Sequence, residues 1–131
     1  MGSEPGCLGL YGLYVILTIL VQAEAGRLQL GLPALLKPRD DMPALTGVAG
    51  RLERAQMNSI VAMALFAPAV LILAHKGIST PTTLLAAQTF LVARVLYVPL
   101  YAFGLPGIRT LVWFTGVLAT VWLYLAGLTD A

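Results

Sequence analysis

The sequence predicts an all-α membrane protein, built as a bundle of four transmembrane helices. Of its 131 residues, 59% are hydrophobic and 11% are charged, and the mean hydropathy is +0.87. Ordinary soluble domains lie far from these values. Four apolar stretches reach or approach the roughly 20 residues that a spanning helix needs. We therefore expect a single domain over residues 1–131, with helices at about 8–32, 50–74, 81–103 and 107–128.

The first stretch is the least regular, because Gln22, Glu24 and Arg27 interrupt its second half. We interpret it as a span that continues into the membrane interface as a partly polar helix end. A secretory signal peptide has a basic segment before its apolar part, whereas Glu4 is the only charged residue before the stretch begins. The first segment is therefore predicted to be a retained helix.

Two prolines lie in the interior of the later stretches. Pro68 in the second stretch is predicted to be a packing kink, which membrane helices tolerate when neighbours satisfy the freed carbonyl. Pro99 in the third stretch should kink that helix near its end. A tight turn at 104–107 then leads into the fourth stretch, which is predicted to return across the membrane.

The basic residues predict the orientation of the bundle. Positive charge gathers at the first and third loops, through Arg27, Lys37, Arg39, Arg51, Arg54, Arg94 and Arg109. Only Lys76 belongs to the opposite side. Cytoplasmic loops of membrane proteins are enriched in Lys and Arg, so both termini are predicted on the non-cytoplasmic side. The net charge of +2 gives no reason to expect nucleic acid as a partner.

Several kinds of site are not supported by the composition. Cys7 is the single cysteine and His75 the single histidine, so no His and Cys cluster with metal-ligand spacing exists, and we expect no metal. A catalytic Ser, His and Asp triad is not expected, because the single histidine belongs to the side of the membrane opposite the clustered arginines. No glycine-rich phosphate loop is visible.

The second stretch opens with polar groups on one face. Arg51, Arg54, Asn58, Val61 and Leu65 follow the three-and-four spacing that stacks side chains along a helix. Charges at membrane depth are costly unless they bind something. This face turns apolar with depth, which suits a ligand with an anionic head and a reactive end deeper in the membrane. Arginine pairs with carboxylates through two parallel hydrogen bonds.

The third stretch repeats the pattern from its other end. Arg94, Tyr97 and Tyr101 are again three and four residues apart, and Arg109 begins the fourth stretch. All of these groups can converge near the predicted cytoplasmic side. They form the candidate binding site.

Simpler interpretations stay open for single residues. Arg51 can extend to lipid headgroups, and Tyr97 with Tyr101 can belong to an interfacial aromatic belt. Glu24 and Glu53 can be local salt-bridge partners of the arginines. Arg94, well inside its helix, is the least easily explained in this way.

Two motifs resemble one known family. KPRDD at 37–41, PALTG at 43–47 and GRLERAQMN at 50–58 resemble the membrane-associated proteins in eicosanoid and glutathione metabolism, abbreviated MAPEG. ARVLYVPLY at 93–101 and GIRT at 107–110 are similar to the family's third-helix and fourth-helix signature. The resemblance covers nearly the whole chain and is greatest to the small bacterial branch.

The resemblance implies a homotrimer that binds glutathione as cosubstrate between neighbouring subunits, near the cytoplasmic side. It assigns Arg109 as the catalytic residue that stabilises the thiolate. Binding roles are implied for Arg51, Arg54, Asn58 and Tyr101, with Arg94 as a supporting contact. Tyr97 joins the predicted binding residues through its spacing from Arg94 and Tyr101. Arg27 matches a late first-helix arginine only loosely, and Thr110 stands where some members carry a hydroxyl proposed to help the thiol.

The chain departs from the family at two positions. Members commonly carry a glutamate that can contact the ligand's amino group where this chain has Val61, and several carry a basic residue at Met57. Two functions are therefore expected. The first is a glutathione-dependent transferase or peroxidase, in the bacterial inner membrane, acting on lipophilic electrophiles or hydroperoxides. The second is a non-catalytic relative that binds an anionic lipid or another thiol, or serves as a membrane partner subunit.

Overall fold

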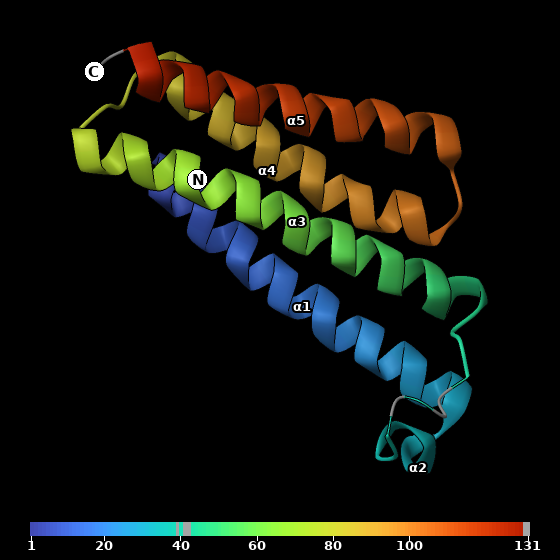
Figure 1. The fold of residues 1–131 in the computed structure, drawn as a ribbon. Helices are drawn as coiled ribbons and strands as arrows, with labels where there is room; N and C mark the ends of the chain where they lie inside the picture. The colour runs from blue at the N-terminus through green and yellow to red at the C-terminus, as the bar shows by residue number, and fades with distance from the viewer. Residues whose placement is uncertain (39, 41–42, 130–131) are drawn as a thin grey trace.

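The computed structural model describes residues 1–38, 40 and 43–129, and in these residues all regular structure is helical. Four long helices lie side by side: α1 (Glu4–Leu30), α3 (Gly47–Lys76), α4 (Pro81–Ala102) and α5 (Pro106–Thr129) (Figure 1). Each is long and apolar enough to cross a membrane. The short α2 (Leu32–Leu35) follows α1 at one end of the bundle. The predicted four-helix fold is therefore confirmed.

The helix ends differ from the predicted ones because local capping decides them. α1 begins at Glu4 rather than at residue 8, since the Ser3 hydroxyl accepts a hydrogen bond from the Gly6 amide. It ends at Leu30, two residues before the predicted end at about 32, because Gly31 has a φ of 83°, which favours glycine. α3 begins three residues before the predicted residue 50 and ends two residues after residue 74.

The remaining ends lie within one residue of the prediction. Thr80 caps α4 with a reciprocal pair of hydrogen bonds to Thr83, and Pro81 occupies the first turn, where a missing N–H costs nothing. α4 ends at Ala102 instead of residue 103, and α5 runs over 106–129 instead of 107–128.

α3 and α4 hold the bundle together, because each of them contacts the other three long helices. Phe90 of α4 stacks on Phe66 of α3 with ring centroids 3.8 Å apart, and Tyr11 of α1 meets Phe90 edge-on at 5.0 Å. All three rings are buried. Aromatic pairs in these geometries contribute about 0.5–1.5 kcal/mol beyond burial of their area.

The loop before α3 is fixed to α1 by one side chain. Gln29 donates to the Thr46 carbonyl and hydroxyl, and its own amide oxygen accepts from the Thr46 N–H at 3.0 Å. Thr46 directly precedes the first residue of α3. This contact therefore holds the start of α3 against the end of α1.

Pro99 leaves a carbonyl in α4 without its helical donor, as expected from its sequence. The lost partner belongs to Val95, four residues earlier, because proline has no N–H. The Tyr14 hydroxyl of α1 donates to this carbonyl at 2.7 Å. A neighbouring helix thus satisfies the group that the proline frees, as membrane helices require.

Tyr14→Phe is expected to lower the free energy of unfolding by about 1 kcal/mol, since it removes this hydrogen bond. A double-mutant cycle with Pro99→Ala gives the control, because alanine restores an N–H donor for the Val95 carbonyl. Unfolding followed by circular dichroism in detergent should show a smaller cost of Tyr14→Phe in the Pro99→Ala background. Equal costs in both backgrounds would mean that Tyr14 does not compensate for the proline.

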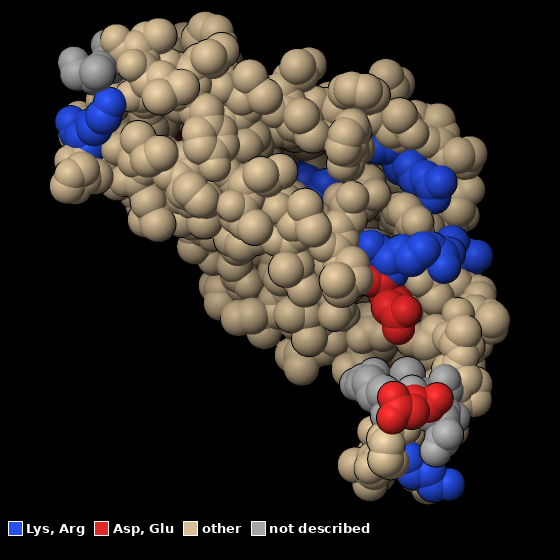
Figure 2. All heavy atoms as spheres, in the orientation of Figure 1, with Lys and Arg blue, Asp and Glu red and all other residues tan. Residues whose placement is uncertain are grey.

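The two ends of the bundle differ in charge. α1 begins and α5 ends at the same end, and the opposite end holds the starts of α3 and α5 (Figure 1). Lys and Arg side chains gather mainly toward that opposite end (Figure 2). Arg39, which supports the predicted orientation, lies outside the described residues. The sides on which the two ends lie stay a prediction from this asymmetry.

Candidate functional site

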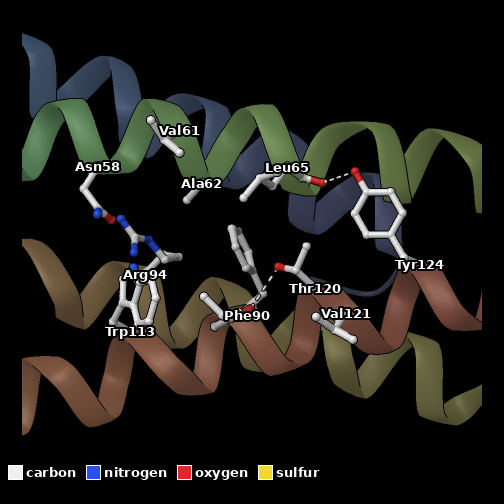
Figure 3. Close-up of a pocket in the computed structure, with 12 residues that line it drawn as sticks. Asn58, Val61, Ala62, Leu65, Phe90, Arg94, Trp113, Thr120, Val121 and Tyr124 are labelled. Atoms are coloured by element: carbon white, nitrogen blue, oxygen red, sulfur yellow. Dashed lines mark hydrogen bonds between the residues drawn. The ribbon is translucent and has the colours of Figure 1, made fainter.

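The first turns of α3 direct three polar side chains differently. Arg51 is half-buried, and its Nε donates to the Ala102 carbonyl at 2.8 Å, where α4 ends. Arg54, one turn later, is exposed and donates from Nε to the Tyr101 hydroxyl at 3.1 Å. Asn58 is half-buried and faces the space between α3 and α5 (Figure 3).

α4 contributes a buried arginine and two tyrosines. Arg94 is 2% exposed, and its guanidinium carbon lies 4.2 Å from the centre of the Tyr97 ring. Tyr97 is also buried, and its ring centroid is 5.7 Å from that of Tyr101. A tyrosine in a lipid-facing aromatic belt would be exposed, so Tyr97 does not fit that simpler interpretation.

Arg109 completes the array from the first turn of α5. Its guanidinium carbon lies 4.4 Å from the centre of the Tyr101 ring, and that of Arg54 lies 5.9 Å from it. Arginines stacked on aromatic faces gain about 0.5–2 kcal/mol, more when desolvated. Tyr101 therefore holds two guanidinium groups from different helices close together at the basic end of the bundle.

Two cavities adjoin these residues. A polar cavity of about 260 Å³ is lined by Asn58, Tyr97, Tyr101, Arg109, Thr110 and Trp113. An apolar cavity of about 340 Å³ lies deeper between α3, α4 and α5 (Figure 3). Asn58 and Trp113 line both cavities, so the two spaces meet at these side chains.

The structure brings together six of the seven predicted site residues. Each of the six either contacts another member of the set or lines one of the two cavities: Arg54, Asn58, Arg94, Tyr97, Tyr101 and Arg109. Arg51 differs, because it lines neither cavity and its Nε donates to the Ala102 carbonyl at the C-terminal end of α4. Arg27 pairs with Glu24 on α1, which confirms Glu24 as a local salt-bridge partner.

Two neighbours of the site were missing from the sequence prediction. Trp113 follows Arg109 by four residues and so lies on the same face of α5, a spacing that could have identified it. Ser59 is buried beside Arg94, with its Oγ 3.4 Å from the arginine Nη2. Its position next to Asn58 placed it on a different helical face, so the motif spacing gave no signal.

The lining residues favour anionic ligands. Arg94 and Arg109 carry positive charge, and Asn58, Tyr97, Tyr101 and Trp113 supply neutral donors. Among the described residues no carboxylate lines either cavity, and Val61 lies on the wall of the apolar one. The arrangement can hold an anion in the polar cavity and an apolar group in the adjoining one.

The motifs and the helical fold agree with the comparison to known proteins. No curated protein and no solved structure matches the chain. A family model, the MAPEG family, matches residues 6–129. Since this match covers nearly all of the four-helix bundle, the protein is a multi-pass integral membrane protein that belongs to the MAPEG family.

Proposed function

We propose that this protein is a glutathione-dependent transferase or peroxidase of the bacterial inner membrane. Its acceptors would be lipophilic electrophiles or hydroperoxides that reach the site from the bilayer. As an assembly we propose a homotrimer, with glutathione bound between neighbouring subunits near the cytoplasmic side. Membership of the MAPEG family supports a glutathione-related role for this bundle.

The observation that carries the proposal is the pair of arginines on Tyr101. Arg109 lies 4.4 Å above the ring and lines the polar cavity, while Arg54 donates to the hydroxyl at 3.1 Å. These contacts hold the two cations in place without neutralising either charge. In this proposal, Arg54 binds a ligand carboxylate and Arg109 faces the ligand sulfur.

The chemistry needs no protein nucleophile. A thiol becomes a strong nucleophile only when ionised, and a nearby guanidinium favours the anion and so lowers the thiol pKa. The glutathione sulfur would then bond to the electrophilic carbon of the acceptor, and the leaving group would depart with its electron pair. Asn58 and Tyr101 would donate hydrogen bonds to the bound tripeptide.

A second candidate function rests on Val61. This side chain lines the apolar cavity, and in the part of the chain that the structure describes neither cavity is lined by a carboxylate that could pair with the amino group of glutathione. A non-catalytic relative that binds an anionic lipid or a thiol without a free amine would have no need of that carboxylate. A role as a membrane partner subunit belongs to the same candidate.

Val61→Glu is expected to tighten glutathione binding about tenfold, because a new carboxylate near Arg94 would pair with the ligand amine. Val61→Gln is the matched control, because a glutamine side chain has nearly the shape of glutamate but no charge. Calorimetric titration of the folded variants measures both affinities. Equal affinities for the Glu and Gln variants would show that the ligand amine does not lie against this part of α3.

Calorimetric titration of the detergent-purified protein with glutathione, followed by a conjugation assay with a chromogenic aryl halide, tests the function itself. Saturable binding together with turnover is the expected result. Binding without turnover toward aryl halides or hydroperoxides would favour the non-catalytic candidate. A folded protein that neither binds nor turns over would contradict the use of glutathione.

A further inference from the structure

The deeper cavity contains a buried cation with an unused donor. Arg94 is 2% exposed, and its Nε has no hydrogen-bond partner among the described residues. Its Nη2 makes a long contact of 3.4 Å with the Ser59 hydroxyl, and its guanidinium lies against the Tyr97 ring. Both of these neighbours are neutral, so they leave the charge of Arg94 uncompensated.

Within the part of the chain that the structure describes, no carboxylate balances this charge. The ion pair found there joins Glu24 to Arg27 on α1, and the residues that line the cavity include no acid. A buried cation without a counter-charge is strongly destabilising, and ionisable groups at membrane depth usually mark a ligand or ion site. Arg94 therefore calls for an anion that the described residues do not supply.

Two neutral donors lie at the same end of the cavity as Arg94. The Asn58 side chain points toward the guanidinium, and Trp113 lines the cavity at that end (Figure 3). An asparagine amide and an indole N–H both donate hydrogen bonds. Beyond these three residues the cavity continues along apolar side chains such as Leu65 and Val121. The donors thus surround space for a small anion at one end of an otherwise apolar chamber.

The guanidinium of Arg94 offers one N–H rather than a pair. A carboxylate takes Nε and Nη2 of an arginine together, as Glu24 does from Arg27 on α1. In Arg94 the Nη2 of this pair faces the Ser59 hydroxyl, and the Nε alone is unused. A single-atom anion can accept one hydrogen bond from each of several directions, so it suits this site better than a carboxylate does.

The hydroxyl groups on and beside this cavity already donate their protons to backbone carbonyls. They belong to Tyr11, Ser59, Thr120 and Tyr124. Tyr97 lines the polar cavity instead of this one. Arginine, asparagine and tryptophan N–H groups do not release protons at neutral pH. The site can therefore stabilise an anion but not protonate it, which suits a halide ion and does not suit an alkoxide or a hydroxide.

We propose that Arg94, Asn58 and Trp113 form a halide-ion site. In the resting protein the ion is chloride from solution, and this binding goes beyond the proposed function because it requires no thiol. That the site also receives the leaving group of a halogenated hydrocarbon rests on the proposed function. Asn58 and Trp113 support this second role, since they connect the halide site with the cavity beside Arg109.

The leaving-group role follows from the direction of displacement at carbon. The nucleophile approaches from the side opposite the leaving group, and the two cavities place one arginine at each side of their junction. The glutathione thiolate beside Arg109, whose proton has passed to solvent, forms a bond to the carbon. The carbon–halogen bond breaks, and its electron pair leaves with the halide toward Arg94.

The two tryptophans of the chain provide a reporter and its control. Trp113 lines the cavity, whereas Trp122 lies on another face of α5 and is 51% exposed. Iodide quenches tryptophan fluorescence on contact. We would therefore titrate iodide, with sulfate keeping the ionic strength constant, into Trp122→Phe, which reports from Trp113, and into Trp113→Phe, which reports from Trp122.

Iodide should quench Trp113 saturably, whereas quenching of Trp122 should rise linearly with concentration. Chloride is a poor quencher, so it should restore the fluorescence of Trp113 by displacing iodide, and acetate at the same concentration should not. Linear quenching of both tryptophans would overturn the proposal. Displacement by acetate as effective as that by chloride would overturn it as well, because it would assign the site to carboxylates.

Three variants in the Trp122→Phe background test the residues. Arg94→Met removes the charge at similar volume and should raise the half-saturating iodide concentration about tenfold or more, the usual effect of losing a hydrogen bond from a charged donor. Asn58→Leu should raise it by a smaller factor. Arg51→Met is the matched control, because Arg51 lines neither cavity. Equal effects of the two arginine variants, or unchanged binding in folded Asn58→Leu, would contradict the site.

Turnover of an alkyl bromide with glutathione tests the leaving-group role. Added bromide should inhibit competitively with the alkyl bromide, at the concentration at which it displaces iodide from Trp113. Bromide that binds without inhibiting would contradict this role and assign the site to chloride from solution alone. The iodide titrations contain no thiol, so halide binding can fail while glutathione turnover persists, and the reverse also holds.

Discussion

Arg109→Ala is expected to lower turnover with an aryl halide about 100-fold, which is the lower range for loss of one group that stabilises a developing anion. The dissociation constant of glutathione should change only a few-fold. Arg109 is proposed to act on the sulfur, whereas the ligand carboxylates are proposed to bind Arg54. Single-turnover kinetics and calorimetric titration measure the two effects separately.

Two further variants make this prediction specific. Arg109→Lys keeps the charge but loses the planar stack on Tyr101, so its turnover should lie between wild type and the alanine variant. Lys76→Ala removes a cation at the opposite end of the bundle, where its Nζ donates to the Gly127 carbonyl, and should leave turnover unchanged. Equal loss of binding and turnover in Arg109→Ala, or no loss of either, would exclude Arg109 as the partner of the thiolate.

Gly50→Ala is expected to be the most destabilising small substitution at the basic end. A Cβ at this position would lie 2.7 Å from the Leu45 carbonyl oxygen, which is backbone and cannot rotate away. Relief requires movement of either the loop before α3 or the first turn of the helix. Overpacking of this kind costs about 1–3 kcal/mol. Thermal unfolding in detergent should therefore occur at a lower temperature than in wild type.

Gly107→Ala is the matched control. Gly107 also lies in the first turn of a helix at the same end, and no atom lies within 4 Å of the Cβ that alanine would add. Its unfolding temperature should equal or exceed that of wild type, because alanine favours helix more than glycine does. If both variants unfold alike, the close approach of Gly50 to Leu45 does not restrain this end of the bundle.

The four-helix fold could be predicted because it depends on the hydrophobic composition of long segments rather than on single residues. Four stretches of about 20 apolar residues leave few alternatives in a bilayer. The helix ends were harder to predict from the sequence, since single side chains determine them. Ser3 extends α1 over the polar residues that precede the apolar stretch, and Gly31 ends the helix between apolar residues.

The site could be predicted in part because several of its residues lie three or four positions apart on one helix and so share a face. Arg94, Tyr97 and Tyr101 meet as their three-and-four spacing requires. Contacts between helices are not encoded in that spacing. For this reason the spacing groups Arg51 with the site although its Nε donates to the Ala102 carbonyl, and it gives no sign of Ser59 beside Arg94.

The most direct test of the central claim is the ionisation state of bound glutathione. A thiolate absorbs in the near ultraviolet where a thiol does not, and a free cysteine thiol ionises with a pKa of about 8.5. Difference spectra at neutral pH should show thiolate when glutathione binds the wild-type protein, and far less with Arg109→Ala at equal occupancy. Bound glutathione that stays a thiol at neutral pH in the wild-type protein would contradict the account.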